Sequence, residues 1–330
     1  MKCINNMRTI SYILCMTLGM LVLSACGKKE YMAPYGMFDS NSSFTIDESS
    51  ASAHNAKLFA ADICVTDEDI TASSTINKDY VYAAAVYNLS TKETLYSYNA
   101  EERVNPASLT KIMTAIIVLE NASLDDVVTI GDVTIKEGGA QLFKLQEGDK
   151  ITVRDLLCVS TIYSGNDASL ALANYVAGSE EAFAALMNEK AKQLGATHTN
   201  FVNCNGLTDE NHYTSAHDLY LMFAEAMKYP EFVTIMNTAS MEINYSSATG
   251  EYISKTITTT DKYLTGEYAT PSSVVVLGGK TGSTNAARKC LMIYGTDSSQ
   301  TPYIAVIMGA EDEPTLYHMM TNLVDDVCSK

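Results

Sequence analysis

Asn105-Pro-Ala-Ser-Leu-Thr-Lys111 is the stretch from which the organisation of this chain follows. Apolar residues at positions 109, 112, 113, 116 and 117 have the spacing of a helix with one buried face. Pro106 suits the first turn of that helix. Ser108 and Lys111 are three residues apart and therefore lie on one helix face. A hydroxyl with an amine one turn away, beside N–H groups that can receive an oxyanion, is suited to nucleophilic catalysis.

The composition is that of a globular protein with a sizeable core. The chain has 330 residues, of which 47% are hydrophobic and 18% are charged, enough for one large domain or two moderate ones. The formal net charge of −17 argues against nucleic acid as a partner and against electrostatic attachment to anionic lipid. We interpret the acidity as a solubilising charge on an exported protein.

The N-terminus has the features of an export signal. Lys2 and Arg8 precede an apolar run over residues 10–23, which is too short to span a membrane comfortably. The run ends in Leu23-Ser-Ala-Cys26, which resembles the lipobox of bacterial lipoproteins. That resemblance implies cleavage before Cys26 and lipidation of its thiol. An ordinary signal peptide with an incidental cysteine, or an uncleaved anchor, is the alternative.

We therefore expect a lipoprotein signal peptide over residues 1–25, a flexible tether over 26–78 and a catalytic domain over 79–330. The mature protein would be anchored by lipid to the outer face of the bacterial cytoplasmic membrane. Cleavage would remove two cations and no acids, so the mature net charge would be −19. A weak apolar patch over residues 58–65 provides an alternative, in which part of the tether docks on the domain.

Five cysteines follow Cys26, and no two of them have the C-x-x-C spacing. An odd number without that spacing supports neither a disulfide framework nor a zinc site. We expect most of them to be buried, small apolar side chains: Cys64, Cys158, Cys204, Cys290 and Cys328.

The order of predicted elements indicates an α/β (α+β) domain whose sheet is completed by both ends of the chain. A hairpin over 81–88 and 94–98 is followed by the Ser108 helix, short strands and turns over 127–153, and a block of helices. The helices are expected at 155–163, 167–176, 180–194 and 214–227, with Gly178 and Gly195 as stops. Strands at 274–277, 290–295 and 303–309 precede a closing helix at 316–328. The expected site is a cleft between the sheet and a helical subdomain.

Two further motifs accompany the Ser108 stretch. Ser164-Gly-Asn166 lies between two predicted helices, and Lys280-Thr-Gly282 follows a predicted strand. Ser-x-x-Lys, Ser-x-Asn and Lys-Thr-Gly in this order resemble the signature of penicillin-interacting serine acyltransferases. The wider stretches 106–114, 164–168, 201–212 and 279–284 resemble the D-alanyl-D-alanine carboxypeptidases, which are low-molecular-mass penicillin-binding proteins. The resemblance covers about residues 80–330.

This resemblance implies a β-lactamase/transpeptidase-like fold, with an antiparallel sheet flanked by helices. It also implies a reaction at the peptidoglycan stem peptide ending in D-Ala-D-Ala. Ser108 would attack the carbonyl of the penultimate D-Ala, and Lys111 would accept its proton, with a pKa lowered by desolvation or by the charge of Lys280. Ser164 would relay a proton to the leaving amine. Asn166 would hold Lys111 and the substrate amide.

The Lys-Thr-Gly motif is expected to bind the substrate. Thr281, helped by the charge of Lys280, would bind the terminal carboxylate, and Gly282 completes the motif. The backbone N–H groups of Ser108 and Ser283 would form the oxyanion hole, each worth about 3 kcal/mol. β-Lactams would act as inhibitors by acylating Ser108. No cofactor and no metal are expected.

Three other interpretations remain open at this point. A class A β-lactamase shares the three motifs but needs a glutamate to activate the deacylating water, and no Glu-x-x-Leu-Asn occurs between residues 167 and 279. A D,D-endopeptidase also remains possible. In a different class, a non-catalytic cell-wall-binding lipoprotein is disfavoured by the intact motifs. His212 and His217 lie near Asp209, but structural hydrogen bonding is a better explanation for them than a metal site.

Overall fold

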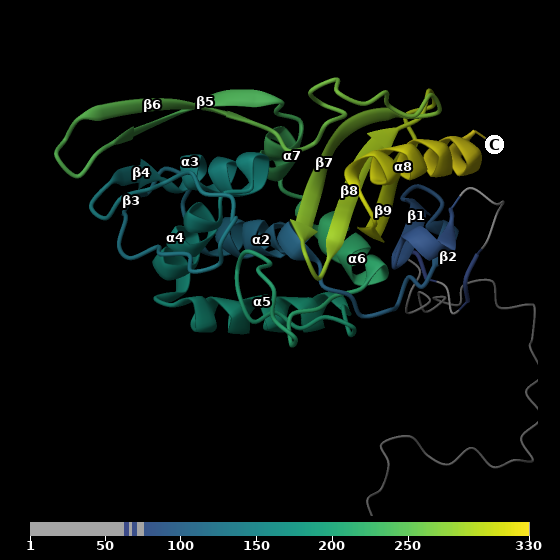
Figure 1. The fold of residues 1–330 in the computed structure, drawn as a ribbon, viewed down its shortest axis with the longest axis horizontal. Helices are drawn as coiled ribbons and strands as arrows, with labels where there is room; N and C mark the ends of the chain where they lie inside the picture. Colours follow the sequence, from purple (N-terminus) through teal and green to yellow (C-terminus); the bar gives the residue numbers. More distant parts are fainter. Residues whose placement is uncertain (1–62, 66–67, 71–75, 330) are drawn as a thin grey trace, which may run out of the picture. The chain divides into compact units, whose positions relative to one another are not determined.

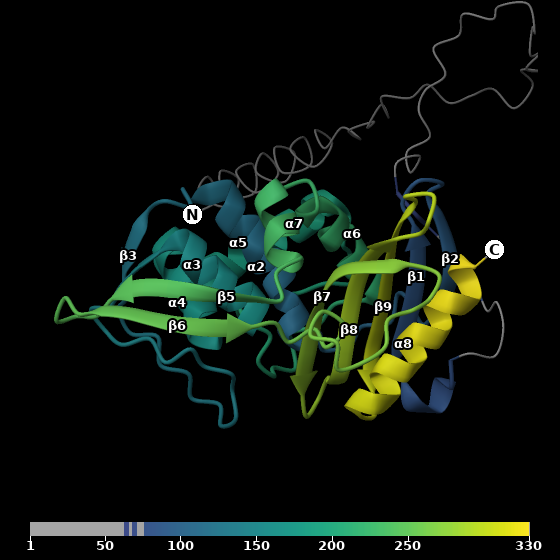
Figure 2. The ribbon, with the colours of Figure 1, turned by 90° about the horizontal axis from the view of Figure 1, so that it is seen from above.

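The computed structural model describes residues 63–65, 68–70 and 76–329 (Figures 1 and 2). The expected signal peptide and Cys26 lie outside the described residues. Within the described ranges, no helix combines the length and the apolar character that crossing a bilayer requires.

A five-stranded antiparallel sheet is completed by both ends of the described chain, as expected (Figure 1). Its strand order is β2-β1-β9-β8-β7, so β1 lies between its hairpin partner and a strand from the C-terminal end. The register pairs Ala85 with Val306. The strands are β1 (Ala83–Asn88), β2 (Glu93–Tyr98), β7 (Val275–Thr284), β8 (Arg288–Thr296) and β9 (Pro302–Ala310).

Both faces of this sheet are covered, which is why every residue of β1 is buried. Successive side chains of a strand point to opposite faces. Ala84 and Val86 therefore pack with α8 (Glu313–Cys328), while Ala85 and Tyr87 pack with the helical block. Figure 2 shows α8 crossing the sheet on the side away from the other helices.

The helical block contains the helices predicted from the sequence. Gly178 and Gly195 end α4 and α5 in left-handed conformations, both at φ +81°, as expected for helix stops. The helical elements are η1 (Lys78–Tyr80), η2 (Ala107–Thr110), α2 (Lys111–Asn121), α3 (Val153–Cys158), η3 (Val159–Tyr163), α4 (Asn166–Ala177), α5 (Glu180–Leu194), α6 (Ala216–Ala226) and α7 (Pro230–Met236).

A second sheet contains four strands, two of which lie in the region where short strands were expected, whereas the hairpin that completes it was not predicted. Its order is β3-β4-β5-β6, and it joins the short strands β3 (Val127–Thr129) and β4 (Lys150–Thr152) to a hairpin of β5 (Ser240–Ser246) and β6 (Tyr252–Thr258). In β5, Ile243 and Tyr245 are buried, whereas Glu242 and Asn244 face solvent. The hairpin covers α3 with one face and leaves the other exposed (Figures 1 and 2).

Residues ahead of position 79 pack on the domain. The backbone N–H of Cys64 donates to Tyr220 Oη at 2.9 Å, and the Cys64 carbonyl lies 2.9 Å from His217 Nε2. The Ile70 N–H donates to Ser97 Oγ at 2.8 Å. The segment expected to be a tether therefore includes docked residues, in keeping with the alternative drawn from its apolar patch. All five cysteines downstream of Cys26 are unpaired and buried.

Candidate active site

Ser108 lies in the η2 turn, one residue after a strained backbone position. The α-helix itself begins at Lys111, so the serine precedes the regular helix instead of lying inside it. Ala107 has a φ of +48°, in the left-handed region that residues with a Cβ rarely adopt. The Asn105 side chain stabilises this conformation by accepting the Ala107 N–H at 3.0 Å. Strained backbone of this kind is typical of functional sites.

Thr110 and Gly206 further fix the η2 turn through contacts with the Ala107 carbonyl group. Thr110 Oγ1 donates to the Ala107 carbonyl at 2.8 Å. Gly206, at φ +86°, packs so closely that an added Cβ would lie 1.8 Å from that carbonyl oxygen. Only glycine fits there, which explains the glycine at this position of the 201–212 stretch.

The Lys111 side chain is fully buried and makes three polar contacts through Nζ. The amine lies 2.9 Å from Ser108 Oγ, 2.8 Å from Asn166 Oδ1 and 2.9 Å from the Asn205 carbonyl oxygen. Burial lowers the pKa of Lys111 well below its ordinary value, and the positive charge of Lys280 lowers it further. Both causes favour the neutral amine.

The neutral amine of Lys111 fits this geometry because each of its hydrogens, and its lone pair, has a hydrogen-bonding partner. A neutral primary amine has two N–H donors and one lone pair. The Asn166 and Asn205 oxygens are acceptors only, so they take both hydrogens. The lone pair is then left for the hydroxyl of Ser108, which is the arrangement that a general base requires. The Asn205 carbonyl was not among the predicted groups.

Ser164 and Lys280 form the second polar pair of the site. Ser164 ends the wide η3 turn in a left-handed conformation at φ +66°. Lys280, on β7, is fully buried and donates to Ser164 Oγ and to the Thr281 carbonyl, both at 3.0 Å. Burial lowers the pKa of Lys280 to about 7, against the opposing effect of the Asp261 carboxylate.

Asp261 is a buried acid that the sequence analysis did not single out. Its Oδ1 accepts the Tyr263 N–H at 3.0 Å, whereas its Oδ2 is buried without a hydrogen-bond partner among the described residues. Burial raises the pKa of Asp261 to about 6. The carboxylate packs against β7, where a Cβ at Gly279 would lie 2.7 Å from Oδ2. This acid therefore lies behind the strand that carries Lys280.

The Lys-Thr-Gly strand passes directly beside the nucleophile. A Cβ at Gly282 would lie 3.1 Å from the Ser108 nitrogen and 2.8 Å from the Pro106 carbonyl oxygen. Ser283 follows on the same strand and lines the cavity. This close approach is compatible with the oxyanion hole expected from the N–H groups of Ser108 and Ser283. Thr281 donates its hydroxyl hydrogen to Thr260 Oγ1 at 2.6 Å.

Asp167, next to Asn166, fixes the loop on the other side of the cavity. Its carboxylate accepts three backbone N–H groups of that loop, from Phe143, Lys144 and Leu145, at 2.7–3.1 Å, and a fourth from Ala168 at 3.1 Å. The Gln141 carbonyl accepts both the backbone N–H and the side-chain amide of Asn166. The Ser-Gly-Asn motif thus positions the loop as well as the amine.

These residues surround a cavity of about 460 Å³. Its lining brings together predicted site residues from all three motifs, and it adds the 137–141 loop, in which Glu137 contributes a carboxylate. Lys111 and Lys280 lie beneath this lining, in contact with Ser108 and Ser164. The lining residues are Ser108, Glu137, Gly138, Gly139, Ala140, Gln141, Ser164, Asn166, Gly206, Leu207, Thr260, Thr281, Gly282, Ser283, Thr284 and Asn285.

His212 has the structural role that was expected for it. The Val202 N–H donates to its Nδ1 at 3.2 Å, so the neutral ring carries its hydrogen on Nε2, which lies 2.8 Å from Thr110 Oγ1. Burial lowers the pKa of His212 to about 4, against the opposing charge of Asp209. This histidine supports the turn that carries the nucleophile.

Comparison with known proteins identifies relatives of this site and fold. A family model described as D-alanyl-D-alanine carboxypeptidase matches residues 70–312. The D-alanyl-D-alanine carboxypeptidase DacF of Bacillus subtilis is 34% identical over 74% of this chain and 61% of its own length. DacC of Escherichia coli is 38% identical over 50% of this chain and 41% of its own length. The chain thus spans less than two thirds of these relatives.

A carboxypeptidase from Streptomyces K15 is matched over more of its length. It is 33% identical over 70% of this chain and 82% of its own. The crystal structure of the Streptomyces K15 DD-transpeptidase superposes with a TM-score of 0.70 and 28% identity, over 76% of this chain and 98% of the other. This superposition confirms the expected fold class.

Proposed function

The chain belongs to the D-alanyl-D-alanine carboxypeptidase family, and from this premise we propose that it removes the terminal D-Ala from peptidoglycan stem peptides. The observation that carries the proposal is the contact between Lys111 and Ser108. A buried amine, with a lowered pKa and both hydrogens committed to other acceptors, lies 2.9 Å from the hydroxyl. This contact places a general base within hydrogen-bond distance of the nucleophile.

Acylation follows from this arrangement. Ser108 Oγ attacks the carbonyl carbon of the penultimate D-Ala while its proton passes to Lys111. The negative charge on the carbonyl oxygen faces the N–H groups of Ser108 and Ser283, each worth about 3 kcal/mol. The C–N bond then breaks, and Ser164 relays the proton held by Lys111 to the departing D-Ala amine, which returns Lys111 to its neutral form. Water hydrolyses the ester in the second half of the reaction and regenerates Ser108.

The terminal carboxylate of the substrate is recognised by charge. Thr281 lines the cavity where β7 borders it, and Lys280 lies beneath that lining in contact with the Ser164 hydroxyl. Because the pKa of Lys280 is about 7, the empty site holds this lysine partly neutral near pH 7. An arriving carboxylate favours the ammonium form, so substrate binding and protonation of Lys280 support each other.

β-Lactams are proposed as inhibitors because they present a carboxylate and a reactive carbonyl to the same groups. The β-lactamase alternative requires a carboxylate that activates the deacylating water, and Glu137 is the cavity-lining acid to test. We expect Glu137→Gln to leave the lifetime of the penicilloyl adduct unchanged. A lifetime that lengthens tenfold or more would favour the β-lactamase mechanism.

One experiment tests the main proposal. The purified chain is incubated with a peptide ending in L-Lys-D-Ala-D-Ala and, separately, with labelled penicillin. We expect release of D-Ala and a slowly hydrolysed adduct on Ser108, both absent from Ser108→Ala and both retained in the surface control Ser299→Ala. Rapid penicillin turnover without D-Ala release would instead favour a β-lactamase. Neither product would favour a non-catalytic wall-binding protein.

Acceptor assays separate the remaining peptidase activities. The structural neighbour from Streptomyces K15 bears the name DD-transpeptidase, so added amino-acid acceptors should be included with the peptide substrate. Hydrolysis that dominates over transfer supports a carboxypeptidase. Cleavage of cross-linked peptide dimers to monomers, tested on isolated peptidoglycan, would support the D,D-endopeptidase alternative.

We also propose that the chain is exported and held at the membrane by a lipid on Cys26. The support is the sequence alone, in which Leu23-Ser-Ala-Cys26 ends an apolar run behind two cations. The test is metabolic labelling with a fatty acid in bacterial cells. Cys26→Ala should lose the label and leave the membrane fraction, whereas the control Cys328→Ala should keep both. Labelling that survives in Cys26→Ala would contradict the anchor.

A further inference from the structure

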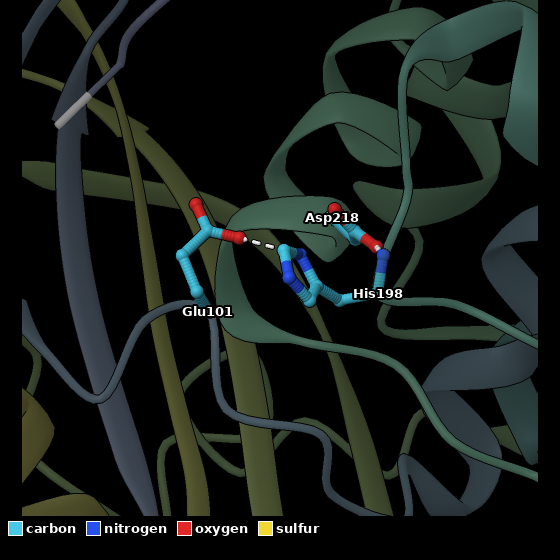
Figure 3. A group of neighbouring side chains, drawn as sticks. All are labelled: Glu101, His198 and Asp218. Carbon is cyan, nitrogen blue, oxygen red and sulfur yellow. Dashed lines mark hydrogen bonds and ion pairs between the residues drawn. The ribbon is translucent and has the colours of Figure 1, made fainter. Parts of the chain in front are cut away.

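Three potential metal ligands from separate segments meet outside the catalytic cavity (Figure 3). Glu101 follows strand β2, His198 lies in the loop after α5, and Asp218 is in the first turn of α6. One ligand atom from each lies within 4.8 Å of the other two. Figure 3 shows the imidazole of His198 between the two carboxylates.

The spacing of Glu101 and His198 is that of neighbouring ligands on one ion. Glu101 Oε2 lies 2.9 Å from His198 Nδ1. Two ligands at about 2.1 Å from a divalent ion lie about 3.0 Å apart at right angles and about 3.4 Å apart at the tetrahedral angle that Zn²⁺ prefers, so the two side chains would move slightly apart to admit zinc. The Nδ1 atom is buried, and it makes no aligned hydrogen bond within the described part of the chain. Its contact is the Glu101 carboxylate, 2.9 Å away, and an ion held between the two groups would replace that contact.

The groups around the cluster already orient its carboxylates. Glu101 Oε1 lies 3.0 Å from His217 Nδ1, which leaves Oε2 for the ion. Asp218 Oδ2 accepts the His198 N–H at 2.8 Å and the Thr199 hydroxyl at 2.7 Å. Metal-binding carboxylates are commonly fixed by hydrogen bonds of this kind.

Charge and access also suit a cation. The side chains of Glu101 and His198 are 42% and 38% exposed, so an ion can enter with part of its water shell. A hollow of about 260 Å³ beside Glu101 is lined by three further acids, Glu68, Asp69 and Glu102. Their negative potential concentrates cations near the cluster. Two carboxylates also balance the charge of one divalent ion.

We propose that Glu101, His198 and Asp218 bind a divalent transition-metal ion, with water completing the coordination. One imidazole and two carboxylates match the ligands that Zn²⁺ takes in proteins. The site differs from the pair His212 and His217 considered from the sequence, and it departs from the expectation of no metal. The ion joins the loop after β2 to the helical block, so its role is to stabilise the domain and not to take part in peptide hydrolysis.

The test uses the purified chain, stripped with a chelator and dialysed, and zinc chloride as the probe. Calorimetric titration should give one Zn²⁺ per chain with a dissociation constant in the micromolar range or tighter. At a hundredfold excess over that constant, the unfolding temperature should rise by about 5–10 °C. The rate of D-Ala release should not change.

Two variants and one matched control localise the binding. His198→Ala and Glu101→Gln should each weaken binding at least tenfold and remove the thermal shift, with the fold checked by circular dichroism. His318→Ala removes an exposed histidine on α8 and should bind as the parent does. Equal binding by His198→Ala and His318→Ala, or no thermal shift of the parent at 1 mM zinc, would overturn the proposal.

Discussion

Replacing Lys111 with methionine removes the amine that faces Ser108 and keeps a side chain of similar length. A positioned general base contributes about 10²–10⁴-fold to a proton-transfer step, which corresponds to about 3–5.5 kcal/mol of activation free energy. The amine is 2.9 Å from Ser108 Oγ and its hydrogens are held by Asn166 and Asn205. We therefore expect Lys111→Met to slow acylation by labelled penicillin by two to four orders of magnitude.

The pH profile gives a second readout that a merely structural role would not produce. Burial and the charge of Lys280 lower the pKa of Lys111 in the folded enzyme, so the neutral base persists at neutral pH. Acidification through that lowered pKa protonates the amine and removes its lone pair. Acylation by the parent enzyme should therefore fall on the acidic side, and the residual rate of Lys111→Met should lack this dependence.

The assay is the second-order rate constant for acylation, followed by fluorescence of the labelled penicillin between pH 4.5 and 9. Lys228→Met, at an exposed lysine, is the matched control and should acylate like the parent. Thermal unfolding of both variants reports the cost of leaving the Asn166 and Asn205 oxygens without a donor, about 1–3 kcal/mol each. If a folded Lys111→Met variant acylates within threefold of the parent, the assignment of Lys111 as base is wrong.

Three further predictions concern groups around this contact. Asp261→Asn removes a charge that raises the pKa of Lys280, so that pKa should fall below about 7 and the ammonium fraction at pH 7 should decrease; KM for a carboxylate-ended peptide should rise several-fold, with KM for the matching peptide amide unchanged. Gly282→Ala places a Cβ 3.1 Å from the Ser108 nitrogen, which should separate the two oxyanion donors and lower kcat by about 100-fold; a parent-like kcat in peptide hydrolysis would exclude this crowding. His212→Ala should lower the free energy of unfolding in urea by about 2 kcal/mol, because buried hydrogen-bonding groups lose their partner. Since the pKa of His212 is about 4, this variant should keep the parent pH–rate profile above pH 5.5, and a changed profile there would assign His212 a catalytic role.

The parts of the site that could be predicted from the sequence are those that depend on how far apart two residues are along the chain. Ser108 and Lys111 are separated by one helical turn, so their contact follows from any helix at that position. Ser164 ends a helical element, as predicted, whereas Lys280 lies within β7 and not after the shorter strand predicted at 274–277. Their meeting, at 3.0 Å, depends on the fold that the family resemblance implied.

The features that the sequence did not predict depend on backbone atoms or on burial in the folded domain. The Asn205 oxygen that accepts a hydrogen bond from Lys111 belongs to the main chain, so no pattern of side chains in the sequence could predict it. Asp261 follows three threonines, a polar context typical of a surface loop, and only packing against β7 makes it a buried acid. The β5–β6 hairpin has a detectable two-residue alternation at Met241, Ile243 and Tyr245, but one open face leaves few apolar residues to mark it.

The position of β1 in the sheet has a consequence for how the protein acquires its structure. The β1–β2 hairpin is made early in synthesis, yet one edge of β1 has unpaired backbone N–H and C=O groups until β9 pairs with it, with Ala85 opposite Val306. Contacts between residues so distant in sequence are slow to form, because a long loop must close first. The helical block lies entirely within that loop and can order beforehand, which shortens the effective search. We therefore expect slow refolding limited by docking of β9, and a chain that depends on chaperones until residues 302–310 have emerged.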